Sequence, residues 1–156
     1  MALVRILVDG YSLLHNWPEL APGKPWHSAA ARDELVHIPT QYRDATSTPF
    51  TTFFDGAGAP PGTSKTESTP DLEVLFSRAG QTADEMIERA AHRFGAYGEV
   101  LAVTDDQTER DVVSGLGGFP SGCLDFIQMV ENTLVEAGDE LRNHNRQERS
   151  RFNRQY

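Results

Sequence analysis

Residues 3–10 read LVRILVDG, and they indicate the class of fold more clearly than any other segment. Apart from Arg5, residues 3–8 are branched aliphatic, and the run is too short to form a helix. A short apolar run of this kind is typical of a strand that is buried on both faces of a parallel sheet. Similar short runs predict three further strands, at residues 50–54, 72–76 and 100–103.

The segments between these strands carry helix signals. Ser28 can cap a helix that starts at the next residue, and Pro39 should break or kink that helix. Thr82 or Gln81 opens another helix, whose apolar side comprises Ala83, Ile87, Ala90, Ala91 and Phe94. Strands that alternate with helices predict an α/β fold with a parallel sheet and helices on both faces.

Later segments are less regular. Residues 56–70 are rich in Gly, Pro, Ser and Thr and predict a loop, and so do the glycine-rich residues 115–122. Residues 111–113 fit either a short helix or part of a fifth strand. Ser121 should cap a last helix, for which Gly138 is a plausible stop.

The chain of 156 residues is long enough for one domain, which we place at residues 1–138. Residues 139–156 form a basic tail that we interpret as either an exposed helix extension or a disordered arm. The tail contains Arg142, Arg146, Arg149, Arg151 and Arg154.

Composition excludes several classes of protein. The formal net charge of -9 argues against a protein that coats nucleic acid through net positive charge. Cys123 is the only cysteine, so an intramolecular disulfide and a thiolate zinc site are both excluded. Residues 1–14 resemble neither a signal peptide nor a membrane span, so we expect a cytoplasmic protein that does not bind membranes.

Carboxylates follow three of the predicted strands. Asp9, Asp55 and Asp106 each come just after an apolar run, and Asp84 comes at the start of a helix. Because the carboxyl ends of parallel strands meet at one edge of a sheet, we expect these groups to converge there. Carboxylates held so close repel one another, and a divalent metal ion normally neutralises such a cluster.

Each carboxylate also has a simpler interpretation. Asp-Gly is a common turn dipeptide, which fits both Asp9 and Asp55. Asp84 and Glu88 share one face of a helix, which could be a solvated face, and Asp84 also suits the positive end of the helix dipole. Asp105 and Asp106 are adjacent, and only one of them is expected to lie in the site. We place Asp106 in the site and Asp105 outside it.

The chemistry that fits such a cluster is phosphodiester hydrolysis. It requires neutralised phosphate oxygens, an activated water and a stabilised leaving oxygen, and one or two Mg²⁺ or Mn²⁺ ions supply all three. Hard cations bind oxygen ligands, so no histidine is needed, and the five histidines show no ligand spacing. A phosphatase or small-nucleotide enzyme is a weaker alternative, because the chain has neither a D-x-D motif after Asp9 nor a phosphate-binding P-loop.

Together the motifs resemble a known family. D-G-Y-x-L, apolar-F-D-G, T-A-D-x-x-I-E and V-x-T-x-D, in this order, are similar to the YacP-like branch of NYN domains, in the PIN-like superfamily of metal-dependent ribonucleases. The resemblance covers residues 3 to about 137. It implies a three-layer α/β/α sandwich with a central, mainly parallel sheet, and endoribonuclease activity with Mg²⁺ or Mn²⁺. It assigns the metal to Asp9, Asp55, Asp84 and Asp106.

The sequence departs from the family pattern at the first motif. The family usually has D-G-Y-N, and here Ser12 replaces the asparagine with one short hydroxyl. We expect Ser12 and Glu88 to assist catalysis without binding the metal directly. Alternatively, Ser12 marks a weakened site, and the chain is a catalytically weak RNA- or ribosome-binding module of PIN-like fold.

A ribonuclease also needs groups that contact its substrate. The expected partner is RNA, with mRNA on the ribosome as one form of it, and the chain should be a monomer or a homodimer. The candidate RNA-binding residues are Lys65, Arg89, Arg93, Arg142, Arg146 and Arg149. In and beside the loop of residues 18–25, Lys24 and His27 are further candidates, whereas Trp17 and Trp26 either stack on bases or, as is more usual in proline-rich loops, pack locally.

Overall fold

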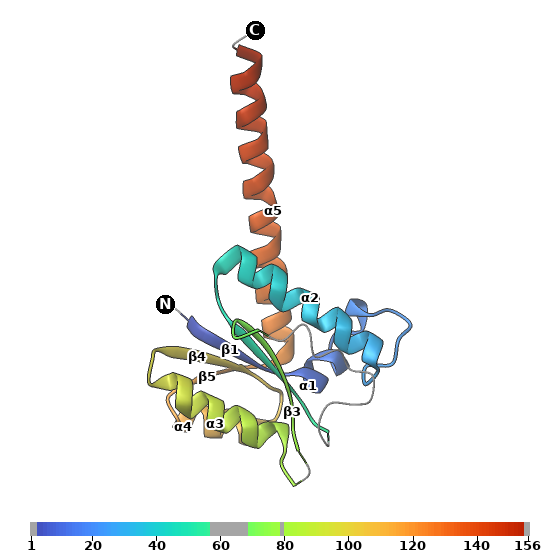
Figure 1. The fold of residues 1–156 in the computed structure, drawn as a ribbon, viewed down its shortest axis with the longest axis vertical. Coiled ribbons are helices and arrows are strands. Elements are labelled where there is room, and N and C mark those ends of the chain that lie inside the picture. Colours follow the sequence, from blue (N-terminus) through green and yellow to red (C-terminus); the bar gives the residue numbers. More distant parts are fainter. Residues whose placement is uncertain (1–2, 57–68, 79, 155–156) are drawn as a thin grey trace.

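A computed structural model describes residues 3–56, 69–78 and 80–154 (Figure 1). Most of the expected loop at residues 56–70, with Lys65, lies outside the described residues. The elements are β1 (Leu3–Asp9), α1 (Gly10–His15), the 3-10 turn η1 (Pro18–Leu20), α2 (Ala29–Thr46), β2 (Phe50–Phe54), β3 (Leu72–Phe76), α3 (Ala83–Gly95), β4 (Glu99–Val103), α4 (Gln107–Gly115), β5 (Phe119–Ser121) and α5 (Cys123–Arg154).

The strands form one parallel sheet in the order β3-β2-β1-β4-β5. β1 lies in the middle, where Val8 is paired with Thr52 of β2 and with Val103 of β4. The carboxyl ends of β2, β1 and β4 therefore lie side by side, as the strand ends in the sequence predicted.

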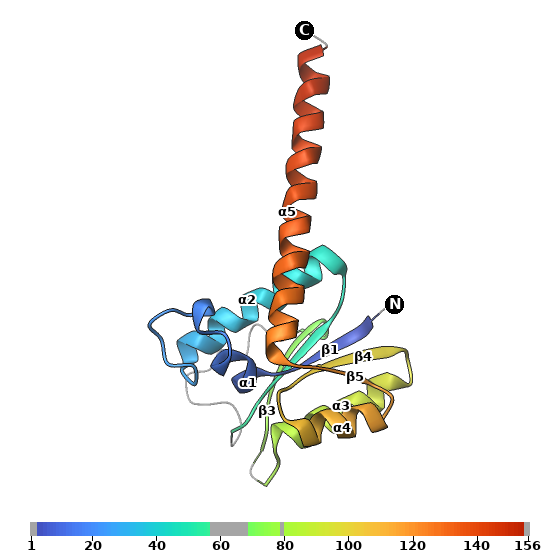
Figure 2. The same ribbon diagram turned by 180° about the vertical axis from the view of Figure 1, so that it is seen from behind.

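Helices cover both faces of this sheet, so the predicted three-layer α/β/α sandwich is confirmed (Figures 1 and 2). On one face, Ile6 and Phe50 pack with Leu13 of α1, Leu35 of α2 and Phe126 of α5. On the other face, the strand residues Leu7 and Phe53 pack with Ile87 of α3 and Val113 of α4. Successive strand residues point to opposite faces, which explains why the strands are apolar throughout.

Gly10 shows why a glycine follows the first aspartate. A Cβ atom at this position would overlap Cε1 of the Phe54 ring, far inside van der Waals contact. The missing side chain lets α1 begin directly at the end of β1, with Phe54 of β2 packed against its first residue. Asp9-Gly10 is thus a strand-to-helix junction.

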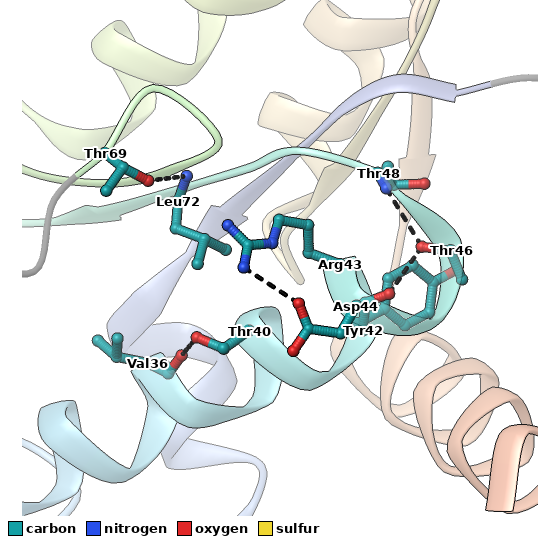
Figure 3. A network of polar contacts seen from close by, with 9 residues as sticks. All are labelled: Val36, Thr40, Tyr42, Arg43, Asp44, Thr46, Thr48, Thr69 and Leu72. Carbon is teal, nitrogen blue, oxygen red and sulfur yellow. Dashed lines mark hydrogen bonds and ion pairs between the residues drawn. The ribbon is translucent and has the colours of Figure 1, made fainter. Parts of the chain in front are cut away.

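α2 is continuous through Pro39, so the first of the two predicted effects, a break, is wrong, and the second, a kink, stays a prediction. The Ser28 cap is confirmed, because the Ser28 hydroxyl accepts a hydrogen bond from the Ala31 amide at 3.1 Å. Pro39 lies on the buried side of α2, where packing offsets the missing backbone hydrogen bond. The helix ends at Ser47, which adopts a left-handed conformation, and nearby the Thr46 hydroxyl donates to the Tyr42 carbonyl (Figure 3).

Two further predictions near the C-terminus need correction. Residues 115–122 are not all loop, because they contain β5, where Pro120 is tolerated on an edge strand that needs fewer hydrogen-bond donors. α5 begins at Cys123, so Ser121 is a strand residue and not its cap.

α5 also runs through Gly138, which was expected to end it. A single glycine between good helix formers costs only about 1 kcal/mol relative to alanine. The basic tail is therefore a helix extension, the first of the two alternatives, and it projects away from the sheet (Figure 1).

Candidate active site

Four aspartates converge at the carboxyl edge of the sheet. Asp9 ends the central strand β1, Asp55 follows β2, Asp106 precedes α4, and Asp84 lies in the first turn of α3. Burial, the largest cause, and the negative charges of Asp9, Asp106, Asp55 and Glu88 together raise the pKa of Asp84 to about 6. The predicted juxtaposition of these four side chains is therefore present in the structure.

Asp9 is held by the residue that departs from the family pattern. The Ser12 hydroxyl donates to Oδ2 of Asp9 at 2.8 Å, and the Ser12 amide donates to Oδ1 at 3.4 Å, so Asp9 caps α1. Burial raises the pKa of Asp9, the two Ser12 hydrogen bonds oppose that rise, and the charges of Asp55 and Asp105 add to it. Ser12 thus orients the Asp9 carboxylate.

Asp55 and Asp106 each accept a hydrogen bond at the start of a helix. Oδ1 of Asp55 accepts from the Ala83 amide of α3 at 2.7 Å, and Oδ1 of Asp106 accepts from the Glu109 amide of α4 at 3.1 Å. The positive ends of both helix dipoles therefore face the cluster and partly offset its charge. Each carboxylate keeps lone pairs that could bind a cation.

Glu109 is a site residue that the sequence analysis missed. Its side chain is only 3% exposed, and no described group donates to its Oε1 atom. Burial raises the pKa of Glu109 to about 8, helped by a hydrogen bond with Glu88 and by the charges of Asp84, Glu88 and Asp106. Two carboxyl groups can share a hydrogen bond only if one of them keeps its proton.

A local signal for Glu109 does exist in the sequence. Asp106 and Glu109 have the spacing of a capping box, in which the second side chain bonds back to the amide of the first residue. Here the Thr104 hydroxyl accepts from the Asp106 amide at 3.2 Å, which leaves the Glu109 carboxyl free to reach Glu88. The sequence shows the spacing of Asp106 and Glu109, but the direction of the Glu109 side chain depends on the hydrogen bond of Thr104.

Asp105 joins the residue that follows α1 to the start of α5. Oδ1 of Asp105 accepts from the Cys123 amide at the start of α5, and Oδ2 accepts from the Asn16 side chain after α1, both at 2.8 Å. Burial raises the pKa of Cys123 to about 12, and the charge of Asp105 contributes. Both oxygens of Asp105 thus accept hydrogen bonds beside the cluster, whereas among the described residues only the Oδ1 atom of Asp106 accepts one.

The basic candidates lie away from the acidic cluster. Arg89 and Arg93 line a pocket of about 210 Å³ between α3 and strands β2 and β3, whereas Glu88 on the same helix turns toward α4. Arg146 and Arg149 are exposed on the projecting part of α5. Nothing is described of Lys65 or of the Arg142 side chain.

Among the described residues, no basic side chain forms an ion pair with a carboxylate of the acidic cluster. The ion pairs there join Arg5 to Glu73, Lys24 to Glu34 and Arg43 to Asp44, none of which belongs to the cluster. In the side-chain positions of the structure, no three His, Cys, Asp or Glu residues among those described lie close enough together to hold one metal ion. The donor types suit a hard cation, and its binding requires the carboxylates to draw closer together.

The parallel sheet and its acidic carboxyl edge place the chain in the PIN-like class of α/β proteins. The chain belongs to the YacP-like NYN domain family, whose sequence model matches residues 6–156. Uncharacterized protein YacP of Bacillus subtilis (strain 168) is 30% identical over 127 residues, which cover 81% of this chain and 74% of that protein.

Solved structures agree with this placement. The crystal structure of Rae1 (YacP) from Bacillus subtilis matches with a TM-score of 0.75 and 25% identity, over 96% of this chain and 85% of that one. A point mutant of the same protein matches with a TM-score of 0.72 and 24% identity, over 90% and 82% of the two chains. Among the described residues, no helix is long and apolar enough to cross a membrane.

Proposed function

We propose that the chain is a metal-dependent endoribonuclease that hydrolyses RNA at the carboxyl edge of its sheet. The observation that supports this most is the set of carboxylates that β1, β2, β4 and α3 bring to one edge, where burial and their mutual repulsion together raise the pKa of Asp84 to about 6. Such repulsion lowers stability unless a cation relieves it, so its presence at one edge favours a functional role. Membership of the YacP-like NYN family supports the same activity.

The residues have distinct roles in this proposal. Asp9, Asp55, Asp84 and Asp106 would hold Mg²⁺ or Mn²⁺, which when bound neutralises phosphate oxygens and makes water a better nucleophile. Ser12 keeps the Asp9 carboxylate in place through its 2.8 Å hydrogen bond. Glu88 and Glu109, which share a hydrogen bond, can exchange a proton beside the reacting groups.

Cleavage of a mixed-sequence single-stranded RNA tests the proposal. The purified protein is incubated with Mn²⁺, with Mg²⁺ and with EDTA, beside the variants Asp9→Asn and Asp106→Asn. Asp33→Asn, at an exposed position of α2, serves as the matched control. We expect metal-dependent cleavage by the parent and the control, and a loss of about 100-fold or more in the two site variants. Equal cleavage by all four proteins contradicts the proposal.

A catalytically weak RNA-binding module is the second candidate. It is favoured by the positions of the carboxylates, because no three described metal-binding side chains are placed to hold one ion. The exposed Arg146 and Arg149 on the α5 extension fit phosphate contacts. This candidate predicts salt-sensitive RNA binding that survives Asp9→Asn but falls when residues 142–156 are removed.

A further inference from the structure

A second pocket lies between α1 and the loop of residues 17–28. Its volume is about 220 Å³, below the usual range of about 300–1,000 Å³ for sites that enclose a drug-sized ligand. It therefore suits a single ring system better than a larger molecule. The lining includes Leu14, His15, Trp17, Lys24, Trp26 and Ala31.

The two tryptophans of this pocket differ in exposure. Trp17 is only 7% exposed and belongs to the core, whereas Trp26 is 44% exposed. Rings of Tyr11, His15 and His27 contact Trp26 edge to face, with centroids 5.9, 5.3 and 5.3 Å away. These contacts fix the indole ring yet leave almost half of the side chain uncovered, which is unusual for so large an apolar group.

The pocket is attached to the acidic cluster through α1. The helix begins at Asp9, which Ser12 holds, and its far end contributes Leu14 and His15 to the pocket wall. A helix of six residues is about 9 Å long. Asn16, just after the helix, bonds to Asp105 at 2.8 Å, which fixes this end of α1 beside the sheet edge.

Charge at the rim suits a nucleic acid. Lys24 lines the pocket, its side chain is 47% exposed, and its ammonium group pairs with Glu34 only at 4.0 Å. A cation held so loosely is available to a phosphate. Aromatic walls with a cation at the rim are the usual means by which proteins bind unpaired bases, since every base has a π face that can stack.

We infer that this pocket receives one unpaired nucleobase of the RNA whose backbone lies at the acidic edge, with Trp26 as the stacking surface. The inference rests on the proposed function for the identity of the ligand as RNA. It gives the loop of residues 17–28 a part in substrate positioning. Of the two interpretations for the tryptophans, base stacking or local packing, a different one then applies to each residue. Trp17 packs in the core, and Trp26 stacks on a base.

The test is a binding measurement made in EDTA, so that no cleavage occurs. A fluorescein-labelled single-stranded RNA is titrated with the parent, Trp26→Ala and Trp26→Phe, and anisotropy gives each Kd. Tyr97→Ala is the matched control, because Tyr97 is 78% exposed and lies after α3, outside the lining of this pocket. An oligonucleotide of the same length without bases separates stacking from phosphate contacts.

We expect Trp26→Ala to weaken binding of the intact RNA by about 5- to 150-fold, the loss expected for one stacked base. Trp26→Phe should keep most of the affinity, Tyr97→Ala should match the parent, and none of the variants should alter binding of the base-free strand. Unchanged affinity in Trp26→Ala, an equal loss on the base-free strand, or no RNA binding by the parent overturns the inference. Failure of the proposed function appears separately, as absence of metal-dependent cleavage.

Discussion

Glu88 of α3 and Glu109 of α4 share a hydrogen bond between their carboxyl groups, and the pKa of Glu109 is raised to about 8. The main cause is burial, since the Glu109 side chain is 3% exposed. The pair joins α3, whose first turn contains Asp84, to α4, which Asp106 caps. At the acidic edge, Glu109, Asp84 and Asp9 therefore hold protons more tightly than isolated carboxyls do, because the pKa of each is raised.

The metal-free protein should lose stability as the pH rises from about 4 to about 8. Asp84 and Glu109 both have raised pKa values in the folded protein, at about 6 and about 8, so the folded state binds more protons than the unfolded state in this range. Their contribution is present below the unfolded pKa values and is lost as the pH passes the folded ones. Thermal melts in EDTA at pH 5 and pH 8 measure the change.

Glu109→Gln should reduce this pH dependence. The amide removes the buried ionisable group, so the melting temperature at pH 8 should rise by about 2–4 °C, the shift expected for about 1 kcal/mol in a chain of this size. Glu85→Gln, at an exposed position in the first turn of α3, is the control and should behave as the parent. The same fall between pH 5 and pH 8 in Glu109→Gln and the parent would show that Glu109 does not titrate as described.

Mn²⁺ or Mg²⁺ should stabilise the protein more at pH 8 than at pH 5. A cation binds the ionised carboxylates, and at pH 5 it has to displace protons, most of all from Glu109 and Asp84. Binding to the folded state alone raises the melting temperature. The measurement is the rise in melting temperature with added metal at the two pH values, and equal rises at both, or none, would count against a cation at this edge.

Gly10→Ala should destabilise the fold by about 1–3 kcal/mol, the usual cost of overpacking. The added methyl group would press into the Phe54 ring at the junction of β1 and α1. Gly95→Ala, at the end of α3, places its methyl group in open space and should be neutral or slightly stabilising. Urea unfolding compares the two variants, and equal stability would remove the steric reason for the Asp-Gly pair.

Asp105→Ala should lower stability and leave the chemistry of the neighbouring Asp106 intact. It leaves the Cys123 amide and the Asn16 side chain without their acceptor, at a cost of about 1–3 kcal/mol. Asp105→Asn keeps one acceptor oxygen and should cost less. Urea unfolding and RNA cleavage are measured together, and loss of cleavage in stable Asp105→Asn would place Asp105 among the catalytic groups.

The sequence predicted the parts of this molecule that depend on local patterns. Four strands could be located because their apolar runs are short and end at polar residues, and parallel strand ends share one edge. This reasoning placed Asp9, Asp55 and Asp106 together, and the helix signal at Thr82 placed Asp84.

The remaining features depend on contacts between distant elements. Pro39 does not break α2, because it lies on the buried side of that helix. β5 was missed because glycine and proline dominate its surroundings, and it is defined by pairing with β4. Glu109 was missed because its direction depends on Thr104 and Glu88, which no periodicity of the sequence reveals.

The decisive measurement for a metal-dependent nuclease site is the rate of RNA cleavage as a function of Mn²⁺ concentration, in the parent and in Asp106→Asn. Asp106 is exposed, and Asn can still accept the Glu109 amide hydrogen bond, so the variant should fold. We expect a saturable rate in the parent, no cleavage in EDTA, and a loss of about 100-fold or more in the variant. Cleavage that is independent of Mn²⁺, or equal in the two proteins, would contradict it.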